Sequence, residues 1–320
     1  MKFSSVVDSY IADMTRAGRF RSPHSELAYR TKLQRLGEQV RNRDPRTVGR
    51  QDVRTVLAHW TNPNSQRQAH AIYAAFFDWC MTEPRDRSER EMICKRNPAR
   101  TIQRARGSQP RVYRMSRDEV VRFLDASNDR RRDRWVGHLG CCAGLRSQEI
   151  RGLQGRHFTR PGWIWVSRDI AKGDKERFVP VLADLEPVVE EILSLIPKDR
   201  YVIPGRRSAG HPTPHIMLDV NKPTSPSAIY KQVIAIGERA GVMGRVTPHI
   251  MRHAYGDHIA RYAGLRVAQA LMGHERVDTT ASTYVDRVSL DELAAQVRGF
   301  SFRRDGVIDL PALDSTRNPA

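Results

Sequence analysis

The chain has 320 residues and a formal net charge of +18 at neutral pH, with a sequence pI near 10.4. A charge this far from zero is not what a neutral metabolic enzyme needs, and it favours a polyanionic partner, above all nucleic acid. Eight of the 54 basic residues are lysine and the other 46 are arginine, whose planar guanidinium can bind a phosphate through two parallel hydrogen bonds.

The sequence has no feature of a secreted or membrane protein. The first residues, MKFSSVVDSYIADMT, place polar and acidic side chains where a signal peptide needs a continuous apolar run. No stretch is long and apolar enough to cross a bilayer, so we expect a soluble cytoplasmic protein without a membrane partner. The four cysteines lack paired CxxC spacing, and we expect buried thiols rather than metal ligands or disulfides. They are Cys80, Cys94, Cys141 and Cys142.

The length suggests two domains, and the first hundred residues are predicted to be wholly helical. A helical stripe of apolar residues there is interpreted as core. It consists of Ala69, Ile72, Tyr73, Phe76 and Cys80. The following segment, NPARTIQRARGSQPRVY at 97–113, combines proline, glycine and many arginines with little apolar periodicity, which indicates a basic linker.

A second domain is predicted to begin with the capping box of Ser116 and Glu119. Further along, WIWVSRDI at 163–170 and RFVPV at 177–181 flank a polar turn and predict an antiparallel hairpin with Lys172 and Lys175 near its tip. Helices are expected at 183–196 and 226–240. The predicted fold class is therefore mainly α with a small antiparallel β-sheet.

Two neighbouring stretches carry the side chains that phosphodiester chemistry without a metal requires. In TPHIMRHAYGDHIA at 247–260, Thr247 is a predicted N-cap, so His249 and Arg252 fall three residues apart on one helical face. In LMGHERVDTTASTYVD at 271–286, a helix is expected to end at Gly273, which leaves His274 just beyond it and the tyrosine of this stretch ten residues further on.

One more capping box, Ser289 and Glu292, predicts a short amphipathic helix near the end of the chain. Docking of residues 289–298 onto a neighbouring protomer and packing onto the same domain both remain open. A poorly ordered polar tail is expected from about residue 303.

These motifs together resemble the tyrosine recombinases, particularly phage-type integrases and Xer recombinases. The resemblance rests on the order and spacing of CCAGLRSQEIRGL at 141–153, KGDKERFVPV at 172–181, HIMRH at 249–253 and LMGH with a later TT and tyrosine at 271–284. It implies a two-domain architecture: a helical core-binding domain at 1–105, a basic linker at 106–114, a catalytic domain at 115–300 and a flexible tail at 301–320. The extra N-terminal arm-binding domain of larger phage integrases is expected to be missing.

The resemblance also implies a role for each candidate residue. Arg146 and Arg252 resemble the two arginines that hold the scissile phosphate, and Glu149 resembles the acidic residue that orients the first of them. The lysine at 172 resembles the general acid toward the leaving 5′ oxygen, with the lysine at 175 as the competing assignment. His249 resembles the histidine that assists deprotonation, and His274 the residue that binds the phosphate.

Tyr284 resembles the nucleophile that forms a 3′-phosphotyrosyl link, although it follows His274 by one residue more than in many relatives. Tyr255 and Tyr262 are rivals whose periodicity places them in packing. For the non-catalytic readings, Glu149 could be a helix-surface carboxylate, and each arginine a contact to the DNA backbone.

The implied function is site-specific recombination of double-stranded DNA by a homotetramer, through a Holliday junction, in a bacterial host at the nucleoid. Accessory DNA-bending or directionality proteins are candidate partners, and no cofactor or metal is expected. Two other functions stay open: a type IB topoisomerase-like nicking-closing enzyme, and a catalytically inactive architectural protein that binds DNA. A metal hydrolase is disfavoured, because HIMRH lacks the glutamate of HExxH.

Overall fold

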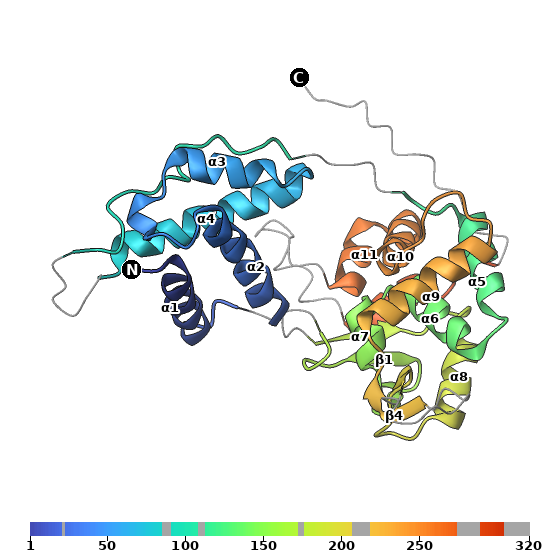
Figure 1. The fold of residues 1–320 in the computed structure, drawn as a ribbon. Helices are drawn as coiled ribbons and strands as arrows, with labels where there is room; N and C mark the ends of the chain where they lie inside the picture. The colour runs from blue at the N-terminus through green and yellow to red at the C-terminus, as the bar shows by residue number, and fades with distance from the viewer. Residues whose placement is uncertain are drawn as a thin grey trace, which may run out of the picture. The chain divides into compact units, whose positions relative to one another are not determined.

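The computed structural model describes residues 1–20, 23–84, 91–107, 113–171, 176–206, 218–273 and 289–303. The chain divides into two compact units, residues 1–111 and 112–320. Figure 1 draws both as mainly helical units, and the second also contains short β-hairpins. The predicted fold class, mainly α with a small antiparallel sheet, is confirmed. None of the described helices is long and apolar enough to span a membrane.

The described residues of the first unit form four α-helices and one short 3-10 helix. They are α1 (Phe3–Arg16), α2 (Pro23–Gln39), η1 (Pro45–Thr47), α3 (Arg50–Ala58) and α4 (Pro63–Thr82). All five residues of the predicted apolar stripe on α4 are buried. Edge-on and tilted aromatic contacts join this stripe to α1, with Phe76 5.2 Å from Phe3 and 5.5 Å from Tyr10 between ring centroids.

The prediction of an all-helical first hundred residues is wrong beyond Thr82. The chain then returns along α4, where a single antiparallel bridge pairs Pro84 with Met92. Asn97 fixes this return, because its amide donates to Ala74 O at 2.8 Å on α4 and its own oxygen accepts from the Ala99 amide at 2.9 Å. Pro84, Pro98 and Asn97 favour an irregular backbone held by side-chain hydrogen bonds over a helix.

The second unit contains eight described α-helices, one 3-10 helix and two hairpins. In chain order the elements are α5 (Arg117–Ser127), α6 (Arg131–Cys141), α7 (Ser147–Gly152), η2 (Gly155–Phe158), β1 (Trp163–Val166), β2 (Arg177–Pro180), α8 (Glu186–Leu195), β3 (Pro204–Arg206), β4 (Leu218–Pro223), α9 (Pro226–Arg239), α10 (Pro248–Ala263), α11 (Leu265–Met272) and α13 (Leu290–Val297). Their apolar faces share one buried core.

The predicted hairpin is present, but its first strand is shorter than expected. β1 pairs with β2 from Trp163 opposite Pro180 to Val166 opposite Arg177. At Ser167 the chain leaves the strand, because the Ser167 carbonyl accepts from the Ala171 amide at 2.9 Å and closes a turn. The predicted tip, with Lys172 and Lys175, lies outside the described residues.

The local helix signals are confirmed where the structure describes them. Ser116 and Glu119 form a reciprocal capping box at α5, and Ser225 caps α9. Thr247 caps α10, and Gly273 ends α11 in the left-handed conformation with φ of 61°. Each signal acts within one helical turn, so the sequence alone could reveal it. All four cysteines are buried free thiols, as predicted.

The last described segment, residues 289–303, packs onto its own unit. The capping box at Ser289 begins α13, which contacts α10 and α11. Residues 301–303 are not part of a loose tail, because Phe300, Ser301 and Phe302 are buried and Asp184 accepts from both the Ser301 hydroxyl at 2.8 Å and the Phe302 amide. Burial of the two phenylalanine side chains stabilises this packing. The packed part of the chain therefore extends slightly further than the polar composition of the predicted tail indicated.

Replacing His138 is expected to reduce the acid sensitivity of this unit. His138 is buried in α6 beside the Arg134 carbonyl, at 2.9 Å from its Nδ1, and burial lowers its pKa to about 4. Because the unfolded chain binds a proton near pH 6.5 and the folded chain does not, stability is lost as pH falls from about 6.5 toward 4. The free energy of unfolding, measured in urea at pH 7 and pH 5, should decrease by about 2 kcal/mol less in His138→Asn than in wild type. Asparagine keeps a donor for the carbonyl. Equal losses in both proteins would refute the assignment.

Candidate active site

The centre of the site is one buried carboxylate that holds two arginines. Glu149, on α7, is fully buried, and its Oε1 accepts from Arg146 Nη1 at 2.9 Å. Arg177, at the start of β2, donates to both carboxylate oxygens at 2.8 Å in a bidentate pair. A bidentate guanidinium pair fixes position as well as charge. The first helix of the site and the hairpin are therefore joined at Glu149.

Arg146 lies just before α7 rather than on it. It is the N-cap residue, and Glu149 is the third helical residue, whose Oε2 accepts from the Arg146 backbone amide at 2.8 Å. Arg146 therefore lies one residue before the helix that carries Glu149. Glu149 thus binds both the backbone and the side chain of Arg146, while the Arg146 side chain keeps 25% of its surface exposed. A ligand can reach that guanidinium.

The electrostatics keep Glu149 ionised. Burial alone would raise its pKa, but the hydrogen bonds and charge of Arg177, together with the backbone amide and charge of Arg146, outweigh burial and hold the pKa below its usual value. One negative charge therefore faces three positive ones, counting Arg252 close by. The excess positive charge suits an anion such as a phosphate.

Arg252 joins three segments of the unit through its guanidinium. Its Nη1 donates to the carbonyl of Gly144, before α7, and its Nη2 donates to the carbonyl of Met272, at the end of α11. These bonds use two of the five N–H donors of the group. Burial, with the charge of Arg146, lowers the pKa of Arg252 to about 10, so the guanidinium stays protonated at neutral pH.

A glycine is required at the turn that precedes Arg146. Gly144 has φ of +60°, and a Cβ there would lie 2.3 Å from Cδ1 of Tyr255. A larger residue would push the turn away from α10 and move the carbonyl that Arg252 binds. The motif GLR therefore needs its glycine for geometry and its arginine for charge.

His249 and Arg252 lie three residues apart on α10, but they differ in environment. His249 is exposed in the first turn, whereas Arg252 is only 3% exposed. The ring of His249 contacts that of His253 edge-on, with centroids 4.3 Å apart. Burial is the main cause that lowers the pKa of His253, which favours its neutral form at this position.

Four of the predicted residues fall in segments that the structure does not describe. Lys172, Lys175, His274 and Tyr284 lie outside the described residues. The structure thus brings Arg146, Glu149 and Arg252 together, with His249 on the same helix as Arg252. Among the described residues, no group of three histidine, cysteine or acidic side chains could hold a metal ion.

Sequence reasoning overlooked Arg177. This side chain is only 11% exposed, and its Nε also donates to the carbonyl of Leu271 on α11 at 3.3 Å. It therefore connects the hairpin to α7 and to the helix that precedes His274. The available signal was its place in KGDKER, directly after the lysine loop.

Removing Arg177 is expected to destabilise the second unit. In Arg177→Met the buried carboxylate of Glu149 keeps only Arg146, and breaking one side of a buried ion pair costs about 3–5 kcal/mol. Urea denaturation measures this cost. Adding Glu149→Gln should recover part of it, because the buried charge disappears with its partner. Two strictly additive losses would contradict the pairing.

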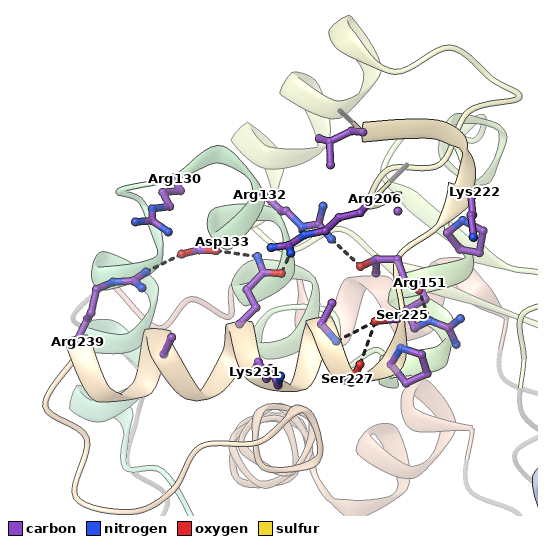
Figure 2. A pocket seen from close by; sticks show the side chains of 18 residues that line it. Arg130, Arg132, Asp133, Arg151, Arg206, Lys222, Ser225, Ser227, Lys231 and Arg239 are labelled. Atoms are coloured by element: carbon purple, nitrogen blue, oxygen red, sulfur yellow. Dashed lines mark hydrogen bonds and ion pairs between the residues drawn. The ribbon is translucent and has the colours of Figure 1, made fainter. Parts of the chain in front are cut away.

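A separate open pocket of about 1050 Å³ lies beside this cluster in the same unit. Figure 2 shows cationic side chains from α6, α7, the β3–β4 hairpin and α9 around it. The cations that line it are Arg130, Arg132, Arg151, Arg206, Lys222, Lys231 and Arg239. The acidic residue of the lining, Asp133, is paired with Arg239 at 2.7 Å. The pocket is therefore strongly basic, and α9 begins at it with its capped N-terminus.

The pocket is physically connected to the arginine cluster. Arg151, on α7, donates through its Nε to the carbonyl of Thr224 at 2.6 Å, and the Thr224 hydroxyl accepts from Arg132 Nη2 at 2.6 Å. The helix that carries Glu149 thus also braces the wall of the pocket. The pocket and the arginine cluster thus share α7, and both carry excess positive charge.

Comparison with known proteins identifies the family. Residues 113–289, more than half of the chain, match the Phage integrase family. The chain belongs to that family. This phage integrase family member is 27% identical over 310 residues to the tyrosine recombinase XerD of Shewanella oneidensis, covering 91% of this chain and 95% of the relative.

Solved structures agree on the fold. Lambda integrase residues 75–356 bound to DNA align with a TM-score of 0.68 at 15% identity, covering 91% of this chain and all of that one. A lambda integrase tetramer bound to a Holliday junction aligns with a TM-score of 0.67 at 15% identity, covering 87% and 79%. The family prediction is confirmed: the chain is a tyrosine recombinase, an enzyme of site-specific DNA recombination.

Proposed function

We propose that this recombinase cuts and rejoins DNA at a specific site through a covalent 3′-phosphotyrosyl intermediate on Tyr284. The observation that supports this most is the cluster of Arg146, Arg177 and Arg252 around Glu149, because it offers fixed positive charge where a phosphate needs it. The transition state of phosphodiester cleavage carries extra negative charge on its nonbridging oxygens, and fixed donors stabilise it better than water does.

The proposed roles follow the chemistry of each side chain. Arg146 and Arg252 bind the nonbridging oxygens, and Glu149 holds Arg146 in place. Tyr284 attacks phosphorus, and His249 assists the removal of its proton. The bond to the 5′ oxygen breaks, and Lys172 protonates that oxygen as it leaves. His274 donates a further hydrogen bond to the phosphate.

The reverse attack reseals the strand without ATP, because the covalent link conserves the energy of the broken bond. No step in this scheme requires a metal or a cofactor. Lysine suits the acid role, since its ammonium can lose a proton when its surroundings lower its pKa. Lys175 is assigned instead to the DNA backbone.

The proposed organisation has residues 1–105 as a DNA-binding domain, 106–114 as a linker and 115–303 as the catalytic domain, whose core includes Phe302. Both domains contact duplex DNA. Four protomers then exchange strands in two steps through a Holliday junction, in the cytoplasm of a bacterial host. Accessory bending or directionality proteins are proposed partners at the recombination site.

Covalent trapping tests the function directly. Wild-type protein is incubated in EDTA with a nicked suicide duplex that carries its attachment site, and a denaturation-resistant adduct is sought. The adduct should form, and mass spectrometry should map it to the peptide containing Tyr284. Specific binding without any adduct on a competent substrate would instead favour an inactive DNA-binding protein, and relaxation of plasmids lacking the site would favour a topoisomerase.

The basic pocket is expected to bind DNA phosphates. In Lys222→Gln/Lys231→Gln, two exposed cations of the lining are neutralised, so affinity should fall for all sequences alike. The slope of log affinity against log salt should decrease by about 1 for each lysine. Titrations between low and high salt measure this. Lys198→Gln, an exposed lysine that does not line the pocket, is the matched control. An unchanged slope in the double variant would exclude the pocket.

A further inference from the structure

A chain of hydrogen bonds ties the end of β1 to the segment that follows α7. His157, on η2, contacts the Ser167 hydroxyl through Nε2 at 2.9 Å, and that hydroxyl donates to Asp169 Oδ1. At the other side of the ring, Nδ1 lies 2.8 Å from the backbone amide of Gln154. We call His157, Ser167 and Asp169 the hairpin relay. β1 packs against η2, the 3-10 helix that follows α7.

The protons of the relay can be assigned from its partners. Nδ1 of His157 lies 3.2 Å from the Gln154 carbonyl oxygen but only 2.8 Å from the Gln154 backbone nitrogen. Because a backbone N–H can only donate, Nδ1 accepts at this shorter contact, and the neutral ring carries its proton on Nε2. The Ser167 oxygen then accepts a hydrogen bond from His157 Nε2–H, and the Ser167 hydroxyl donates a hydrogen bond to the carboxylate of Asp169. Burial, as the largest cause, lowers the pKa of His157, which keeps the ring neutral. Every member thus has one consistent role.

The relay is not a hydrolytic triad. In a nucleophilic triad the serine donates to the histidine, but here Ser167 donates to the carboxylate instead. His157 is fully buried and Ser167 is 4% exposed, so no substrate can reach either. The role of the relay is therefore to fix the positions of the segments that it connects.

The hairpin relay fixes one end of the segment that contains the proposed general acid. After Ser167 the chain turns, and Ile170 packs against Gly152 of α7, where a Cβ would lie 2.3 Å from Ile170 Cγ2. The carboxylate of Asp169 pairs with Arg156 at 3.2 Å. Lys172 is the second residue after Ile170 in the sequence.

The other end of the loop is tied to the same helix. Arg177 is the second residue after Lys175 and holds Glu149 of α7 with two hydrogen bonds of 2.8 Å. Both ends of the 172–175 segment are therefore fastened to the helix that also fixes Arg146. Such double attachment limits where the ends can lie relative to the phosphate-binding arginine.

We propose that the hairpin relay is a positioning network for the general acid of strand cleavage. It acts through Lys172 by fixing the β1 end of the lysine loop against α7, and it rests on the function proposed above. When the P–O5′ bond breaks, the electron pair goes to O5′, which takes a proton from the Lys172 ammonium. A displaced loop delivers that proton more slowly, although the arginines still bind the phosphate.

A substrate with sulfur in place of the bridging 5′ oxygen separates this role from general structural support. A thiol is far more acidic than an alcohol, so a 5′ thiolate leaves without being protonated. Single-turnover cleavage is compared on the oxygen and sulfur suicide duplexes for Ser167→Ala, Asp169→Ala and Lys172→Ala. Asp169 is exposed, so its variant carries little risk to folding. Ser127→Ala removes another buried, hydrogen-bonded hydroxyl, on α5, and serves as the matched control.

On the oxygen substrate, Ser167→Ala and Asp169→Ala should cleave about tenfold more slowly than wild type. Lys172→Ala, which removes the acid itself, should lose about 10²–10⁴-fold. On the sulfur substrate all three should return to within about threefold of wild type. Asp169→Asn, which keeps an acceptor for Ser167, should recover much of the oxygen rate, and Ser127→Ala should match wild type on both.

The outcomes discriminate between the two levels of the hypothesis. Equal slowing of the relay variants on both substrates, or no slowing on either, overturns the positioning role while leaving the recombinase chemistry intact. Lack of sulfur rescue for Lys172→Ala rejects Lys172 as the acid, and the relay proposal with it. Failure of wild-type protein to form an adduct on either substrate rejects the proposed function itself.

Discussion

Tyr284→Phe should form no covalent adduct with a nicked suicide substrate, a loss on the order of 10⁴-fold or more in cleavage. The substitution removes the phenolic oxygen that attacks phosphorus, and no other group in the scheme can replace it. DNA affinity should stay within about twofold of wild type, because binding is dominated by cationic contacts to the backbone and the variant changes no charge. Denaturing electrophoresis of the adduct and a binding titration measure the two effects.

Tyr255 supplies the matched control for this substitution. Its side chain is fully buried against Gly144, and its hydroxyl has no hydrogen-bond partner among the described residues. Burial raises its pKa, which makes it a poor nucleophile. Tyr255→Phe should therefore retain adduct formation and leave stability unchanged or slightly higher. If Tyr284→Phe still formed an adduct and Tyr255→Phe did not, Tyr255 on α10 would be the nucleophile instead.

Arg252→Ala should lower the rate of strand cleavage by about 10²–10³-fold, the usual cost of losing one preorganised donor to the transition state. The guanidinium carries a positive charge beside Arg146 and also holds the carbonyls of Gly144 and Met272. Its removal takes away charge and releases the turn before α7. Single-turnover cleavage at saturating protein separates this loss from weaker binding.

Arg252→Lys distinguishes charge from geometry. Lysine keeps the charge, but its compact ammonium cannot span two carbonyls as the planar guanidinium does, so activity should recover only in part. Arg261→Ala removes an exposed arginine of the same helix, and its rate should stay within about threefold of wild type. Full activity of Arg252→Lys would show that the bridge between the carbonyls is unnecessary.

The helix boundaries show what local sequence can predict. Ser116 with Glu119, Thr247 and Gly273 each act on backbone groups within a turn, and each was found where the sequence indicated. The β3–β4 hairpin escaped prediction for the opposite reason. β3 is only three residues long and begins with proline, and β4 consists largely of polar residues of low strand propensity, so tertiary pairing forms it.

Ordered motifs and one-turn helix signals lie in neighbouring positions of the chain, so the family, the fold class and the candidate residues could be predicted from them. How those residues are held depends on contacts between distant segments. Arg177 lies 28 residues from Glu149, and Arg252 lies 108 residues from Gly144. Helical periodicity placed His249 and Arg252 on one face, yet packing left the first exposed and buried the second. Burial and long-range hydrogen bonds depend on which segments meet in space, and local spacing carries no record of that meeting.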